Sequence, residues 1–117
     1  MSESSLTRRV CDGWKQLNGI ALSFTGSQYQ RPGIADRFLA HRRVPGGAWV
    51  EFKLGANAQS AAQRILARQL TERGCLCVVA RHPSNDKIGA IEDWDGRPLA
   101  EWDGSALGLL TALEAIP

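Results

Sequence analysis

The chain has 117 residues, of which 44% are hydrophobic and 22% charged, and its formal net charge is +2. This length and composition predict a single globular domain, residues 1 to 117, with its own core. They exclude a membrane-spanning chain, because no apolar run approaches the required length. No signal-peptide pattern opens the sequence, so we expect a cytoplasmic protein. The three cysteines lack C-x-x-C spacing, which favours reduced buried thiols over a zinc site.

Charge is distributed unevenly along the chain. Residues 1 to 81 hold 12 Lys and Arg against 5 Asp and Glu, whereas residues 82 to 117 hold 2 against 7. The first part is therefore expected to present a positive surface, as binding to a phosphate backbone requires. The alternative for any single arginine is that it lies on the solvent-exposed face of a helix and has no binding role.

The first third of the chain predicts a helix, a strand and a loop. Apolar residues recur at intervals of three and four between Ser5 and Leu17, which predicts a helix over that range. Asn18-Gly19 supplies a helix-ending glycine signal. Residues 20 to 24 follow as a short strand, and residues 25 to 32 as a polar loop suited to substrate contact.

Two short apolar runs, residues 33 to 40 and 49 to 54, form a predicted strand pair joined by a turn at Pro45-Gly46-Gly47. Alternate residues of a strand point the same way, so Glu51 and Lys53 share one face of the second strand. An acid and an amine therefore project together from one face of the sheet. The opposite face belongs to the core and carries Val50, Phe52 and Leu54.

The register of this strand pair decides where a second acid lies. With the turn centred near Pro45, Asp36 falls opposite Leu54 rather than Glu51. A bend or bulge near Asp36 is therefore needed to bring the two carboxylates together.

A helix and a buried strand follow. Ser60 to Arg73 predicts a helix that Gly74 ends, and the apolar run at residues 75 to 80 predicts a strand covered on both faces. This strand is expected to run parallel to the one before the helix. The order is then α, β, β, β, α, β, an α/β core with a mixed central sheet. The buried stripe of the second helix is expected at Ala62, Ile65, Leu66, Gln69 and Leu70.

Residues 82 to 117 form a C-terminal extension of different character. Turn residues recur through it, and Ser105 to Ile116 predicts a terminal helix. Trp94 and Trp102 are expected to anchor packing rather than to stack on bases.

Three pieces of sequence carry a resemblance through their order and spacing: Gly33-Ile34-Ala35-Asp36-Arg37, Glu51-Phe52-Lys53 and Ser60-x-x-Gln63. With them, about residues 3 to 81 resemble the PD-(D/E)XK nuclease superfamily. The compact form is similar to the virus-type replication-repair nuclease (VRR-NUC) domain, and more distantly to the archaeal Holliday-junction resolvases. The resemblance implies a restriction-endonuclease-like αβββαβ core, a metal-dependent DNA endonuclease and a phage or prophage origin.

The same resemblance implies roles for single residues. Asp36, Glu51 and the backbone carbonyl of Phe52 would bind Mg²⁺ or Mn²⁺, whose preferred ligands are oxygens. Lys53 would orient or activate the attacking water. The family also places a glutamate of the first helix near the metal, and Glu3 is the residue available for that position.

Other polar residues have two interpretations each. In the family the glutamine of Ser60-x-x-Gln63 points towards the site, but the same pattern is a helix capping box, and both interpretations can hold together. Arg37 is a candidate for phosphate contact or for an ion pair with Asp36 or Glu72. The candidate DNA contacts are Arg31, Arg37, Arg42, Arg43 and Arg64.

Two alternatives to a nuclease remain open. One is a nuclease-fold protein that binds DNA without cutting it. The other is a structural subunit in which Glu51 and Lys53 form an ion pair on a sheet face, worth about 0.2 to 1 kcal/mol. As a nuclease, so small a domain would read branched DNA more easily as a homodimer. No base-reading motif is present, so DNA structure rather than sequence is expected to select the substrate.

Overall fold

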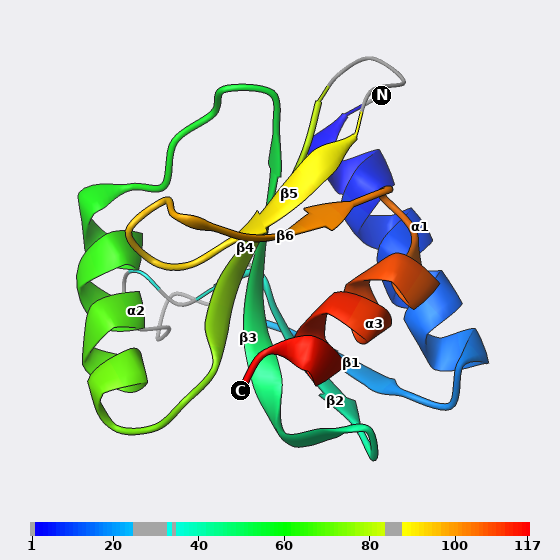
Figure 1. Ribbon diagram of the computed structural model, residues 1–117. Helices are drawn as coiled ribbons and strands as arrows, with labels where there is room; N and C mark the ends of the chain where they lie inside the picture. The colour runs from blue at the N-terminus through cyan, green and yellow to red at the C-terminus, as the bar shows by residue number, and fades with distance from the viewer. Residues whose placement is uncertain (1, 25–32, 34, 84–87) are drawn as a thin grey trace.

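The computed structural model describes residues 2–24, 33, 35–83 and 88–117, so the predicted loop at 25–32 and most of the predicted turn at 82–86 lie outside it. The elements follow the predicted order up to the fourth strand and then continue with two strands and a helix (Figure 1). In chain order they are α1 (Glu3–Gln16), β1 (Ile20–Ser23), β2 (Arg37–His41), β3 (Val44–Leu54), α2 (Ala61–Glu72), β4 (Cys77–His82), β5 (Gly89–Glu92), β6 (Pro98–Trp102) and α3 (Ala106–Ala115).

All six strands form one sheet in the order β1-β2-β3-β4-β5-β6. β3 and β4 are parallel, as predicted for strands joined by a helix, and every other neighbouring pair is antiparallel. Figure 1 shows α2 on one side of the sheet and α1 with α3 on the other. The predicted α/β architecture, a mixed central sheet flanked by helices, is therefore confirmed. None of the described helices has the length and apolar character needed to cross a membrane.

The main core lies between the sheet and the helix pair α1 and α3. Leu6, Val10 and Trp14 enter it from one stripe of α1, at the spacing of an amphipathic helix. Val50 and Phe52 enter it from β3 and are fully buried. The alternation predicted for this strand therefore holds, since Val50 and Phe52 enter the core, whereas Glu51 and Lys53 lie on the other face.

The β2–β3 hairpin turns earlier than predicted. Its turn is Arg42-Arg43, and His41 lies opposite Val44. Pro45-Gly46-Gly47 belong to β3 instead, where these three residues stand opposite Ala40 alone and shift the register. The predicted turn at Pro45 is therefore wrong, because the glycine pair builds a bulge rather than the reversal of the chain.

This bulge aligns the two acids. Arg37 pairs with Val50 across the strands, so the preceding residue, Asp36, falls level with Glu51. The irregularity that the sequence required is present, but it lies at the turn end of the hairpin instead of near Asp36.

The buried stripe of α2 is narrower than predicted. Leu66 is the buried residue of this helix, whereas Ile65 is 58% exposed and Gln69 is also exposed. The reason is that α2 meets the sheet mainly at β4, so one row of its side chains is covered.

The C-terminal extension enlarges the sheet, which the sequence did not predict. β5 pairs with β4 and β6 with β5, and α3 packs beside α1. Trp102 is buried, and its Nε1 donates a hydrogen bond to the carbonyl of Ser105 (2.8 Å), so it is the predicted packing anchor. Trp94 is half-buried beneath the guanidinium of Arg68, which lies 5.7 Å from the ring centroid.

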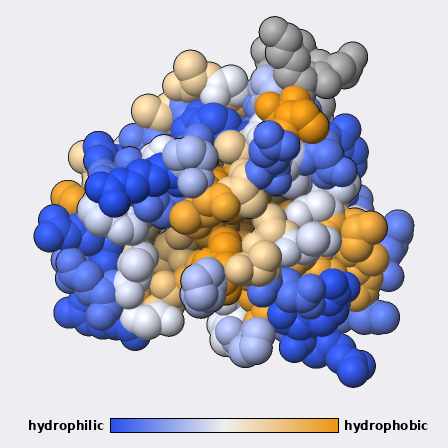
Figure 2. All heavy atoms as spheres, in the orientation of Figure 1, coloured by the Kyte–Doolittle hydropathy of each residue, from blue (hydrophilic) through white to orange (hydrophobic). Residues whose placement is uncertain are grey.

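One apolar groove lies apart from the predicted site residues. Figure 2 shows polar side chains over the outside of α2 and apolar ones towards the middle of the same face. A groove of about 370 Å³ is lined there by residues of the α2–β4 loop, β6 and the C-terminus, among them Leu76, Leu99 and Ile116.

Candidate active site

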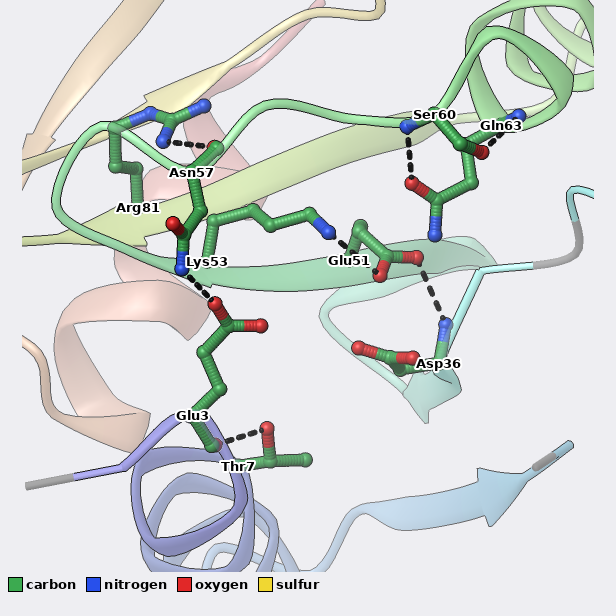
Figure 3. Close-up of polar contacts among 9 residues, drawn as sticks. All are labelled: Glu3, Thr7, Asp36, Glu51, Lys53, Asn57, Ser60, Gln63 and Arg81. Atoms are coloured by element: carbon green, nitrogen blue, oxygen red, sulfur yellow. Dashed lines mark hydrogen bonds and ion pairs between the residues drawn. The ribbon is translucent and has the colours of Figure 1, made fainter. Parts of the chain in front are cut away.

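Asp36 and Glu51 meet beside the bulged hairpin (Figure 3). Glu51 projects from β3 and is only 4% exposed, and Asp36 immediately precedes β2. The backbone N–H of Asp36 donates a hydrogen bond to Oε2 of Glu51 (3.2 Å), and Nζ of Lys53 lies 3.7 Å from Oε1. The structure therefore brings three of the predicted site residues together.

The surroundings of Glu51 oppose its ionisation. Burial, then the charge of Asp36 and a hydrogen bond with its side chain, raise the pKa of Glu51 from 4.5 to about 8. The ammonium of Lys53 acts in the opposite direction but does not offset these effects. A buried acid beside a second acid is an arrangement that a bound cation would relieve.

The donor set fits a hard divalent cation. Carboxylate oxygens, with water completing the coordination, are what Mg²⁺ and Mn²⁺ take from proteins. Within residues 2–24, 33, 35–83 and 88–117, no three His, Cys, Asp or Glu side chains converge as a metal-binding group. Asp36 and Glu51 would therefore supply two ligands, and the carbonyl of Phe52 remains a predicted third.

Glu3 reaches towards this region from the opposite side of the sheet. It is the first residue of α1, and the side chain of Ser2 caps the helix there. Its carboxylate accepts a hydrogen bond from the side-chain amide of Asn57, in the loop between β3 and α2 (Figure 3). Glu3 and Asp36 line one cleft of about 590 Å³. Glu3 is thus held in the cleft that Asp36 lines, by a neighbour that the sequence did not single out.

Gln63 combines its two interpretations. Ser60 N–H donates to its Oε1 (2.8 Å), and Gln63 N–H donates to Oγ of Ser60 (3.1 Å), so the capping box is formed. The cap uses the amide oxygen, and in Figure 3 the amide nitrogen of Gln63 points towards Glu51. Glu51 and Gln63 both line a small cavity between β3 and α2. Gln63 can therefore cap the helix and still take part in the reaction. Its part in the reaction stays a prediction.

The side chain of Arg37 lies against the backbone of the site. Its Nη1 donates to the backbone carbonyl of Asp36 (2.8 Å). It also approaches Cys11, where burial raises the pKa of the thiol and the charge and hydrogen bond of Arg37 lower it. The ion pair with Glu72 is not formed, because that acid pairs with Arg68.

Two arginines predicted to contact DNA pair with acids of the C-terminal extension. Arg43 binds both carboxylate oxygens of Glu114 (2.6 and 3.0 Å), and Arg64 lies 3.0 Å from an oxygen of Asp95. The uneven charge of the sequence is therefore partly neutralised in the fold. Contacts of these arginines with DNA stay predictions. The other two candidates are Arg42, exposed in the hairpin turn, and Arg31, outside the described residues.

The cleft beside Asp36 contains basic residues that the sequence alone did not single out. Arg8 and Lys15 of α1 line it together with Arg37. Among the described residues, neither Arg8 nor Lys15 forms an ion pair. Their spacing of seven residues, about two helical turns, places them on one face of α1 and was the signal available in the sequence.

No family model and no curated protein matches the sequence. The fold is similar to that of Hjc, a Holliday junction resolvase from the archaeal hyperthermophile Archaeoglobus fulgidus. The TM-score is 0.58 at 12% sequence identity, over 79% of this chain and 77% of that one. It is also similar to a VRR_NUC domain, with a TM-score of 0.53 at 22% identity, over 66% of this chain and 81% of that one. Both of these structures have the PD-(D/E)XK nuclease fold, and this chain shares their architecture, a mixed six-stranded sheet with flanking helices that resembles the restriction-endonuclease-like fold of Hjc.

Proposed function

We propose that this protein is a divalent-metal-dependent nuclease that hydrolyses phosphodiester bonds in DNA. The observation that carries the proposal is the contact between Asp36 and the buried Glu51, with Lys53 3.7 Å from the same carboxylate. Burying ionisable groups together is costly, and such groups with perturbed pKa values cluster at functional sites. A divalent cation is the ligand that would allow both acids to ionise in place.

Each side chain has a role in this reaction. Asp36 and Glu51, with the carbonyl of Phe52, hold Mg²⁺ or Mn²⁺. When bound, the ion supplies Lewis-acid polarisation of the phosphate and a water of lowered pKa. Lys53 orients the attacking water or offsets the charge that develops on the phosphate oxygens. The amide nitrogen of Gln63, which the helix cap does not use, donates a hydrogen bond to water or phosphate near Glu51.

The cleft between α1 and the first two strands offers a path for a DNA strand. Arg8, Lys15 and Arg37 line this cleft beside the acid pair. Contacts to phosphates carry no sequence information, so DNA structure, such as a junction or another branch, selects the substrate. The similar fold of Hjc, a Holliday junction resolvase, supports this choice.

A homodimer with two such sites suits a branched substrate. A sedimentation mass equal to one chain at working concentration would contradict it. The expected location is the cytoplasm of a bacterial or phage-infected cell.

Cleavage of labelled DNAs tests the proposal. A four-way junction, a flap, a duplex and a single strand are incubated with Mg²⁺, Mn²⁺ or EDTA. Wild type is compared with Glu51→Gln and Lys53→Gln, and Glu72→Gln serves as a control because it removes a charge from an exposed ion pair within α2, that of Arg68 and Glu72. We expect metal-dependent cutting that each site substitution lowers by about 100-fold or more and that the control leaves unchanged.

A DNA-binding protein without catalysis is the second candidate. It is favoured by the finding that only two carboxylates converge among the described residues. In that case no DNA is cut, and Asp36→Ala and Glu51→Ala leave DNA affinity unchanged or raise it by removing negative charge. Neither cutting nor binding would contradict both candidates.

A further inference from the structure

A chain of hydrogen bonds connects the C-terminal extension to Glu3. It begins at Glu92 in β5, whose Oε2 accepts from Nε of Arg81 in β4 (3.0 Å). Nη1 of Arg81 donates to the backbone carbonyls of Gly55 (2.8 Å) and Asn57 (2.6 Å). The side chain of Asn57 then donates to the carboxylate of Glu3, as the left half of Figure 3 shows.

Two consecutive residues of β4 hold the loop that carries Asn57. The side chains of Arg81 and Glu92 are 23% and 15% exposed, so this ion pair is shielded from solvent better than the pairs on the outer surface. The carbonyl of His82, the next residue of β4, accepts a hydrogen bond from Gly55 N–H (2.9 Å). The direction of the Asn57 side chain is therefore set by the fold.

This loop lies at the end of β3, where the chain leaves the sheet and crosses to the face covered by α2. α1 and α2 cover opposite faces, and the loop joins β3 to α2 (Figure 1). The bond between Asn57 and Glu3 thus fastens the start of α1 to the end of the strand that carries Glu51 and Lys53. It leaves Glu3 in the cleft that Asp36 also lines.

We propose that Asn57 and Arg81 are positioning residues that hold the carboxylate of Glu3 in the cleft lined by Asp36, where its negative charge acts on the ion site formed by Asp36 and Glu51. This proposal rests on the metal-dependent function proposed above. Residues that orient groups around a metal site commonly change metal affinity by about 10- to 100-fold when they are altered. The extension takes part through Glu92, although none of its residues belongs to the predicted catalytic set.

Metal affinity without turnover tests the proposal. Binding of Mn²⁺ is measured by calorimetry without DNA for wild type, Asn57→Ala, Glu92→Gln and Glu3→Gln. We expect about tenfold weaker binding for each variant. Glu114→Gln is the matched control, because it makes the same change in an exposed ion pair, and it leaves affinity unchanged. Unchanged affinity in Asn57→Ala would overturn the proposal.

A double-mutant cycle identifies the route of the effect. If Asn57 acts through Glu3, then Asn57→Ala adds nothing in the Glu3→Gln background, because both changes remove the same carboxylate interaction. Losses that add would mean that Asn57 acts by another route and would overturn the proposal.

Hydrogen exchange provides a readout that needs no metal. In Glu92→Gln, exchange is expected to rise together at residues 55 to 58 and in the first turn of α1. A rise confined to the loop would break the link to Glu3 and overturn the proposal. Absence of Mn²⁺ binding by wild type would instead overturn the nuclease function and this proposal together, so the two failures are distinguishable.

Discussion

The backbone N–H of Asp36 and the ammonium of Lys53 lie against different oxygens of the Glu51 carboxylate, at 3.2 and 3.7 Å. The orientation of this buried side chain is therefore set from two sides before any ligand binds. Such preorganisation is what a site needs in order to stabilise charge without rearranging. The protonation of Glu51 is then the property most sensitive to what binds beside it.

Stability of the metal-free protein is expected to fall as pH rises. The pKa of Glu51 is raised from 4.5 to about 8, chiefly by burial, so between these values the folded state keeps a proton that the unfolded chain has lost. The stability from this group is complete below the lower value and is lost as pH approaches the higher one, by roughly 1.4 kcal/mol per pH unit. Urea unfolding in EDTA across this range measures the slope. Glu51→Gln should flatten it, and equal slopes in both proteins would contradict the prediction.

Binding of Mn²⁺ is expected to tighten with pH over the same range. The ion requires the ionised carboxylate and must displace the proton of Glu51, so affinity rises by up to about tenfold per pH unit until pH passes the raised pKa. Calorimetry at neutral pH in buffers of different ionisation enthalpy should detect release of close to one proton. Binding without proton release would show that Glu51 is not a ligand.

Replacing Gly47 is expected to disturb the site from a distance. Its φ is 70°, and a Cβ there would stand 2.5 Å from the ring of Phe38 and 3.0 Å from the carbonyl oxygen of Leu39. Gly47→Ala should therefore strain the bulge that aligns the acids, lowering both unfolding free energy and Mn²⁺ affinity.

Gly46→Ala is the matched control for this change. Gly46 also has a positive φ, 82°, but a Cβ would meet nothing within 4 Å. It should cost only the backbone strain, about 1 kcal/mol, and leave metal affinity intact. Equal losses in the two variants would show that the close contacts of Gly47 are unimportant.

The cleft beside Asp36 is expected to bind phosphates through Arg8, Lys15 and Arg37, although Glu3, Asp12 and Asp36 also line it. Arg8→Gln and Lys15→Gln should each weaken DNA binding about equally across sequences and reduce the slope of log affinity against log salt by about 1. Arg73→Gln is a charge-matched control, because Arg73 lies at the end of α2 and donates to the carbonyl of Gln69. Fluorescence anisotropy at several salt concentrations measures both quantities. A slope that changes as much in the control as in the cleft variants would place the DNA elsewhere.

The part of the site within one strand could be predicted from the sequence. The face shared by Glu51 and Lys53 follows from the two-residue period of a strand, which depends on no distant contact. The register could not be predicted, because Pro45-Gly46-Gly47 has the composition of a turn and also suits a bulge. The close approach of Gly47 to Phe38, which suits the bulge, exists only in the folded hairpin.

The parts of the fold that depend on long-range contacts could not be predicted from local sequence patterns. β5 and β6 are only four and five residues long, and turn residues surround them, so the pairing of β5 with β4 and of β6 with β5 defines them rather than their sequence. The residues that hold Glu3 could not be predicted either, because Asn57 and Arg81 belong to no sequence motif. Their roles come from hydrogen bonds between segments that are far apart in sequence.

The contacts of the candidate site differ in the order in which the chain can make them. Asp36 and Glu51 are 15 residues apart in one hairpin, whereas Glu3 and Asn57 are 54 residues apart. Closing a longer loop costs more chain entropy, so local pairings form first. We therefore expect the contact between Asp36 and Glu51 to form earlier in folding than the contact between Glu3 and Asn57, which requires α1 to dock. A cation held by the hairpin would stabilise that early stage as well as the native state.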